Sequence, residues 1–296
     1  MTDIADRPEV APELRLVPHA FRQMFGRPAE GVWYAPGTVP LMAGHPRSLT
    51  VCARWGAIVA GERRDDGALE LASINRPAEP ASLGAAGAVP PWAEPIVAVA
   101  EKIGVGSGTT LLCSVDLPRG SGLAAATALA CAAALALRDL HRPDLSIEDL
   151  IAVVADSEAA FRGRAGRALG HDGAAVPFDL AASGQRLLVV DTRIRPGPSL
   201  PPVRATGLDD DLGPALTGYH RAQHRDPEQD AVVEAALAAG AHGASALADG
   251  PGRPVVVLAD ASAVRTIRAA ITAACSLAPR YVTVLPTRGA YRVDRG

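Results

Sequence analysis

The segment Leu117–Leu129, LPRGSGLAAATAL, has the composition of a loop that leads into a helix and can bind phosphate. Gly120 and Gly122 let the backbone come close to a ligand. The N–H groups at the start of the following helix attract anions whatever the side chains are. The segment has no lysine and few hydroxyls, and a plain strand-to-helix turn uses the same glycines. Taken alone, it therefore leaves phosphate binding and a simple turn open.

The overall composition favours a globular protein that binds a small molecule or another protein. The chain has 296 residues, 48% of them hydrophobic, and a net charge of −3 with both signs interleaved. It therefore offers no basic face for nucleic acid and no polybasic anchor for a membrane. Because its four cysteines are widely spaced, buried thiols in a reducing cytoplasm fit better than disulfides or a metal site. No apolar segment reaches the length of a membrane span, so we expect a cytoplasmic protein. No bound metal cluster is expected either, because the cysteines are so far apart.

The order of the expected elements predicts an α+β protein of two layered domains. Residues 1–18 read as a flexible tail, 19–193 as the first domain, 194–212 as a linker rich in Pro, Gly and Asp, and 213–296 as the second domain. The DDG turn at 65–67 between apolar runs predicts a β-hairpin. A single helix is expected to carry IEDLIAVVADSEAAF and to end near Gly163.

Four segments in order resemble the galactokinase-type members of the GHMP small-molecule kinases. They are YAPGTVPLMAGH (34–45), LPRGSGLAAATAL (117–129), VPFDLAASGQRLLVVDTR (176–193) and GAHGASALADGPGRPVVVL (240–258), and the resemblance spans about residues 20–292. It implies a two-domain fold, with a ribosomal-protein-S5-like N-terminal domain and a ferredoxin-like C-terminal domain. The second half is shorter than in the family, which suggests that a homodimer could cover apolar surface left exposed there.

The resemblance implies a site with ATP and Mg²⁺ as cofactors. Asp179 takes the place of the catalytic aspartate, and N-capping of LAAS is its simpler alternative. The resemblance also implies two sets of binding residues: for the cofactor Arg119, Gly120, Ser121, Gly122, Leu123, Ala124 and Thr127, and for the substrate Thr38, His45, Arg47, His171 and Asp172.

Departures from the family pattern bear on the chemistry. Ala124, Ala125 and Ala126 stand where the family has serines, one of which helps to hold magnesium. Thr38 stands where the family has the arginine that stabilises transferred phosphoryl charge. Arg47 replaces a carboxylate that reads galactose, which argues against galactose and favours an anionic ligand.

Two functions follow from the resemblance and its departures. The first is ATP-dependent phosphoryl transfer to a hydroxyl of a small, non-galactose metabolite. The alternative is a kinase-derived protein that no longer phosphorylates, such as a ligand sensor, a regulatory subunit or an enzyme that uses the same cleft for other chemistry.

Overall fold

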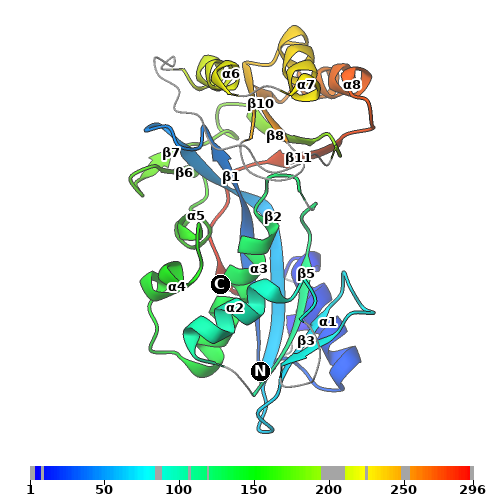
Figure 1. The fold of residues 1–296 in the computed structure, drawn as a ribbon, viewed down its shortest axis with the longest axis vertical. Helices are drawn as coiled ribbons and strands as arrows, with labels where there is room; N and C mark the ends of the chain where they lie inside the picture. The colour runs from blue at the N-terminus through cyan, green and yellow to red at the C-terminus, as the bar shows by residue number, and fades with distance from the viewer. Residues whose placement is uncertain are drawn as a thin grey trace.

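The chain folds around two β-sheets of different size. The computed structural model describes residues 4–7, 10–83, 89–105, 108–118, 120–194, 211–223, 226–247 and 254–293. The larger sheet forms the elongated lower body in Figure 1, and the smaller sheet lies at its upper end beneath three helices.

The larger sheet has eight strands, six of them in the order β12-β1-β2-β5-β3-β4. Strands β6 and β7 extend it, since β6 pairs with the start of β2. The strands are β1 (Gly31–Leu41), β2 (Leu49–Arg63), β3 (Leu69–Ser73), β4 (Ala81–Leu83), β5 (Thr109–Val115), β6 (Arg167–Gly170), β7 (Ala175–Pro177) and β12 (Tyr291–Arg292).

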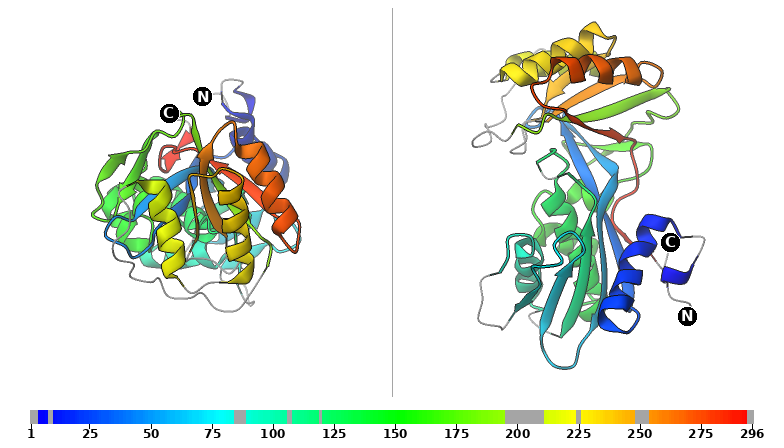
Figure 2. Two further views of the ribbon diagram at one scale, coloured as in Figure 1. Left: turned by 90° about the horizontal axis from the view of Figure 1, so that it is seen from above. Right: turned by 90° about the vertical axis from the view of Figure 1, so that its right-hand side faces the viewer.

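Helices cover both faces of this sheet. One face packs against α2 (Glu94–Ile103) and α3 (Ala125–His141), with α4 (Ile147–Val153) and α5 (Glu158–Arg162) beside them. The other face packs against α1 (Pro12–Phe25), which Figure 2 shows on the opposite side of the sheet. The strands are therefore buried on both faces, which explains why β1 and β2 are almost continuously apolar.

The smaller sheet has the strand order β11-β8-β10-β9, and all of its pairs are antiparallel. Its strands and helices are β8 (Gln185–Asp191), α6 (Leu212–Ala222), α7 (Pro227–Ala238), β9 (Gly243–Ala246), β10 (Val255–Asp260), α8 (Val264–Ala274) and β11 (Arg280–Val284). In this sheet the fourth strand along the chain lies beside the first, followed by the third and the second. This order is ferredoxin-like, as expected.

Two of the expected domain limits are wrong, because α1 and β8 pack with other elements than the limits imply. The tail of residues 1–18 includes the start of α1, because Val17 and Phe21 are fully buried against the sheet. The limit at 193 falls too late, because β8 already pairs with β10 and β11 of the second sheet. The chain then returns to the first sheet through β12. Residues 195–210 of the expected linker lie outside the described residues.

Two local predictions also differ from the structure. The turn at 65–67 does not form a hairpin, because β5 lies between β2 and β3 and pairs parallel with β3. The expected helix through 147–163 is two helices, α4 and α5, separated at Asp156, whose φ of 56° is left-handed. This break turns out to lie beside a cavity.

The packing of α1 makes the first prediction. Replacing the fully buried Phe21 by Ala should lower the free energy of unfolding by about 3–5 kcal/mol, because it leaves a cavity between helix and sheet. Urea unfolding followed by circular dichroism measures this loss. Met24→Ala is the matched control on the same helix: its side chain is 52% exposed, and the change should stay within about 0.5 kcal/mol. Equal effects of the two substitutions would mean that α1 is not docked.

Candidate functional site

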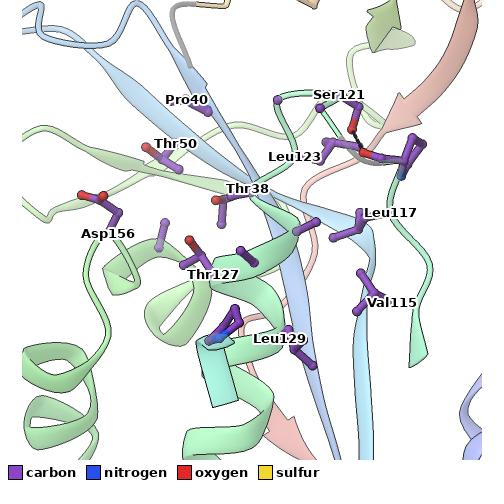
Figure 3. Close-up of a pocket in the computed structure, with 18 of the residues that line it drawn as sticks. Thr38, Pro40, Thr50, Val115, Leu117, Ser121, Leu123, Thr127, Leu129 and Asp156 are labelled. Atoms are coloured by element: carbon purple, nitrogen blue, oxygen red, sulfur yellow. Dashed lines mark hydrogen bonds between the residues drawn. The ribbon is translucent and has the colours of Figure 1, made fainter. Parts of the chain in front are cut away.

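A cavity of about 1020 Å³ lies at the N-terminal end of α3, inside the larger sheet's helical face. Its walls come from β1, β2, the loop after β5, the first turn of α3 and the connection between α4 and α5. Figure 3 shows this arrangement, with the first turn of α3 at its centre. A cavity of this volume accommodates a ligand the size of a nucleotide.

The loop before α3 turns sharply, with a left-handed backbone at three positions. Gly120, Gly122 and Ala124 have φ angles of 75°, 71° and 49°. The hydroxyl of Ser121 donates to the carbonyl of Pro118 at 2.7 Å, so this side chain stabilises the loop itself. The N-cap position, Ala124, provides no side-chain cap. The first-turn N–H groups of a 17-residue helix are therefore left for an anion in the cavity.

Strand β1 holds this loop by close backbone contact. The N–H of Thr38 donates to the carbonyl of Leu123 at 3.2 Å. A Cβ atom on Gly37 would lie only 2.8 Å from that same oxygen, so the contact requires glycine. The register of β1 and β2 shifts between Pro36 and Thr38, and this irregularity brings β1 onto the loop.

Two carboxylates that sequence reasoning missed line the cavity. Asp156 lies in the break between α4 and α5, and Glu158 begins α5. Glu158 also pairs with Arg162 at 3.1 Å, four residues later on the same helix. The sequence ADSEAAF does contain an Asp-Ser pair before an acidic first turn, which is a helix-start signal within the predicted single helix.

The other end of the cavity combines apolar rings with fixed polar groups. Trp92 lines it, and its indole N–H donates to the carbonyl of Glu79 at 2.9 Å, which fixes the ring. The side-chain oxygen of Asn75 accepts from the N–H of Val115 at 2.8 Å, which leaves the Asn75 amino group as a donor. Pro91 and Pro95 complete this apolar end. A flat ring with hydrogen-bonding edges, such as a nucleobase, suits such a surface.

Most of the predicted binding residues come together in this cavity. Its described lining includes Thr38, Gly120, Ser121, Gly122, Leu123, Ala124, Thr127 and His171. Arg119 lies outside the described residues, as do 248–253 of the glycine-rich segment near the end of the chain.

Asp179 is not part of this lining. It is exposed, and its carboxylate accepts from the N–H of Ala182 at 3.0 Å, which caps the turn before β8. Its role in the structure is thus the capping role that the sequence offered as the alternative to catalysis. The assignment of Asp179 as a catalytic base finds no support in this geometry.

Three predicted substrate residues also lie outside the cavity lining. His45 is buried in a turn, where its Nδ1 accepts from the N–H of Arg47 at 3.1 Å, and burial lowers the pKa of the imidazole. Arg47 is in the same turn and does not line the cavity, so it gives no support for an anionic ligand there. Asp172 accepts from the N–H of Ala174 at 3.0 Å and closes the turn between β6 and β7.

A match to a known domain indicates the relationship of this chain. Residues 93–176 match the GHMP kinases N terminal domain. Over this stretch the chain is similar to the GHMP kinases. The matched stretch contains α2, β5, the loop and all of α3, α4 and α5, and it therefore covers much of the cavity.

Individual relatives agree with this family. The galactokinase of Streptomyces coelicolor is 29% identical over 374 aligned positions, which cover 92% of this chain and 97% of that protein. The alignment is longer than the 296-residue chain, so the Streptomyces protein has segments without a counterpart here.

Solved structures show the same α+β GHMP kinase fold. The crystal structure of Lactococcus lactis galactokinase complexed with galactose has a TM-score of 0.78 at 15% identity and covers 95% of this chain and 100% of its own. The Methanococcus jannaschii mevalonate kinase has a TM-score of 0.65 at 11% identity and covers 87% of this chain and 98% of its own.

The described part of the chain has neither a side-chain group suited to a metal ion nor a helix suited to a membrane span. Within those residues, no group of three or more His, Cys, Asp or Glu side chains is arranged to hold a metal ion. The same residues contain no helix with the length and apolarity needed to cross a bilayer.

The capping role of Asp179 gives the second prediction. Asp179→Ala should lower the free energy of unfolding by about 1 kcal/mol, because the N–H of Ala182 loses its acceptor. Asp179→Asn keeps a side-chain oxygen and should recover most of that loss. Neither change should alter nucleotide affinity measured by calorimetry. A large fall in affinity with intact folding would return Asp179 to the site.

Proposed function

We propose that this protein binds a magnesium nucleoside triphosphate in the cavity beside α3 and transfers its terminal phosphoryl group to a hydroxyl of a small metabolite other than galactose. The observation that carries the proposal is the uncapped N-terminus of α3, whose first-turn residues line the cavity. Similarity to the GHMP kinases, in the matched domain and in the galactokinase of Streptomyces coelicolor, supports the reaction class.

The cavity residues fit a nucleotide in three parts. The apolar end around Trp92 and Asn75 suits the base. The left-handed loop from Gly120 to Ala124 and the start of α3 suit the phosphates, because they present backbone N–H groups without a side-chain cap. The remaining end, near Thr38, is left for the acceptor.

The same lining fits Mg²⁺, with a carboxylate as the protein ligand in place of the family's serine hydroxyl. Magnesium is commonly held by one or two carboxylates together with phosphate oxygens and water. Glu158 supplies such a carboxylate, and the first-turn alanines supply no hydroxyl. When bound, the ion would neutralise charge on the phosphates. The residues of this chain position the nucleotide and keep one hydroxyl, that of Thr127, near the helix start.

A second function has its own observation in favour. Asp179 caps a turn outside the cavity lining. By the resemblance, Thr38 stands where the family has an arginine. A protein of this kind would bind the nucleotide and report or transmit its presence without transferring phosphate. Partner proteins would then read the state of the cavity.

The third prediction tests nucleotide binding by calorimetric titration with ATP, with and without Mg²⁺. The wild-type protein should bind more tightly with the ion. Glu158→Gln should weaken binding in the presence of Mg²⁺ about tenfold, because a charged ligand is lost, and should change binding without Mg²⁺ little. Asp172→Asn is the matched control, because that carboxylate lies outside the cavity lining.

The two functions separate in a turnover assay on the same protein. Release of ADP that depends on an added hydroxyl compound supports the kinase. Binding of ATP with no turnover across a broad set of sugars, polyols and amino alcohols supports the second function. Absence of ATP binding at millimolar concentration contradicts both.

A further inference from the structure

Thr38 is a mostly buried residue that lines the cavity and has a side-chain hydroxyl. Its exposed fraction is 5%. Among the described residues, no hydrogen bond is formed by this hydroxyl; only its backbone N–H is engaged, with Leu123. A hydroxyl at a cavity wall that has no protein partner is available to a ligand or to water.

Asp156 is the second group at this end. It lines the cavity at its rim and is exposed, and within the described part of the chain its carboxylate forms no ion pair or hydrogen bond. In Figure 3 the side chains of Asp156, Thr38, Thr50 and Thr127 occupy one side of the view. The apolar side chains of Leu117 and Val115 occupy the other. The polar side is assembled from β1, β2, α3 and the break between α4 and α5.

The charges of the described lining are unevenly distributed. Asp156 and Glu158 carry negative charge, and Arg76 carries positive charge. Arg76 lines the end of the cavity that we assign to the base, as Trp92 does, and it pairs with Glu79 at 3.5 Å. If Glu158 binds the metal ion, the negative charge of Asp156 at the acceptor end is left without a neutralising cation in the described lining.

We propose that Asp156 and the Thr38 hydroxyl bind the acceptor, and that this acceptor is a hydroxyl compound bearing a protonated amine, such as an amino sugar or amino alcohol. An ammonium group donates to the Asp156 carboxylate in a charge-assisted hydrogen bond, which is stronger than a neutral one. The hydroxyls of the same molecule exchange hydrogen bonds with the side-chain hydroxyls of Thr38, Thr50 and Thr127. A carboxylate or phosphate on the acceptor is repelled by Asp156.

The proposed acceptor is cationic, whereas Arg47 led the sequence analysis to expect an anionic ligand. The inference rests on the proposed function for the place of the nucleotide, because the acceptor end is defined as the part of the cavity that the triphosphate leaves. Recognition of the amine by Asp156 is nevertheless measurable without phosphoryl transfer, so the two claims can fail separately.

The test uses three sugars with one pyranose frame and different charges: D-galactosamine, D-galactose and D-galacturonate. Each is titrated into the full-length protein saturated with Mg²⁺ and a non-hydrolysable ATP analogue, and binding is followed by saturation-transfer NMR. Galactosamine should bind about fivefold or more tighter than galactose, as expected for a charge-assisted hydrogen bond, and galacturonate should bind weakest.

Three variants connect this order to the named side chains. Asp156→Asn should abolish the advantage of galactosamine, and Asn accepts the left-handed backbone at this position, where φ is 56°. Thr38→Val should weaken binding of all three sugars about fivefold through the lost hydroxyl, while Thr38→Ser should restore it. Asp179→Asn, outside the cavity lining, is the control for a general effect of removing a charge.

Several outcomes overturn the inference. Galacturonate binding as tightly as galactosamine would do so, as would an unchanged preference in Asp156→Asn. Binding of the nucleotide analogue with no binding of any of the three sugars would also overturn it, and would leave the nucleotide site intact. Conversely, an Asp156-dependent preference for galactosamine in protein that fails to bind the nucleotide analogue supports this inference and contradicts the proposed kinase.

Discussion

The contact between β1 and the carbonyl of Leu123 is the constraint on which the site depends. The N–H of Thr38 binds that oxygen, and Gly37 allows the approach because it has no side chain. The register shift between β1 and β2 allows this approach. A hydrogen bond stabilises it: the hydroxyl of Tyr34 in β1 donates to the carbonyl of Arg54 in β2 at 2.6 Å. The same backbone contact therefore fixes the loop and brings the Thr38 hydroxyl into the cavity.

The position of α3 is fixed at both ends by β1. At its start the Leu123 contact holds the loop, and near its end the indole N–H of Trp33 donates to Asp139 at 2.9 Å. Between these points the helix buries a series of alanines against the sheet and α2, which allows close backbone approach. A helix held this firmly presents its N-terminus without reorganisation when an anion binds. The structure thus retains the part of an anion site that needs no special side chains.

The sequence predicted the elements whose signals are local. The loop expected to lead into a helix at 117–129 does so, and its glycines at 120 and 122 have the left-handed backbone before α3. Pairing between distant segments was less accessible: nothing local to the DDG turn shows that β5 will separate β2 from β3. The resemblance to the GHMP kinases and the α+β fold, both expected from the order of motifs, are confirmed.

Site residues were predicted less well because position in a motif does not fix where a side chain points. Asp179 has the right residue type, yet its carboxylate accepts from the N–H of Ala182 and caps a turn. Arg47 follows His45 into a turn whose backbone is held by the imidazole. Asp156 went unnoticed because the apolar pattern around it continues through the break. Only tertiary structure shows that the break faces a cavity.

The charge around the cavity bears on the rate of any phosphoryl transfer. Such reactions are accelerated by positive charge fixed where negative charge develops. In the described lining, the cationic Arg76 lies among the residues proposed to bind the base, and the neutral Thr38 lies near the end proposed for the acceptor. Stabilisation near the transferred group is then left to the α3 N-terminus, equivalent to roughly half a unit charge, and to a bound cation.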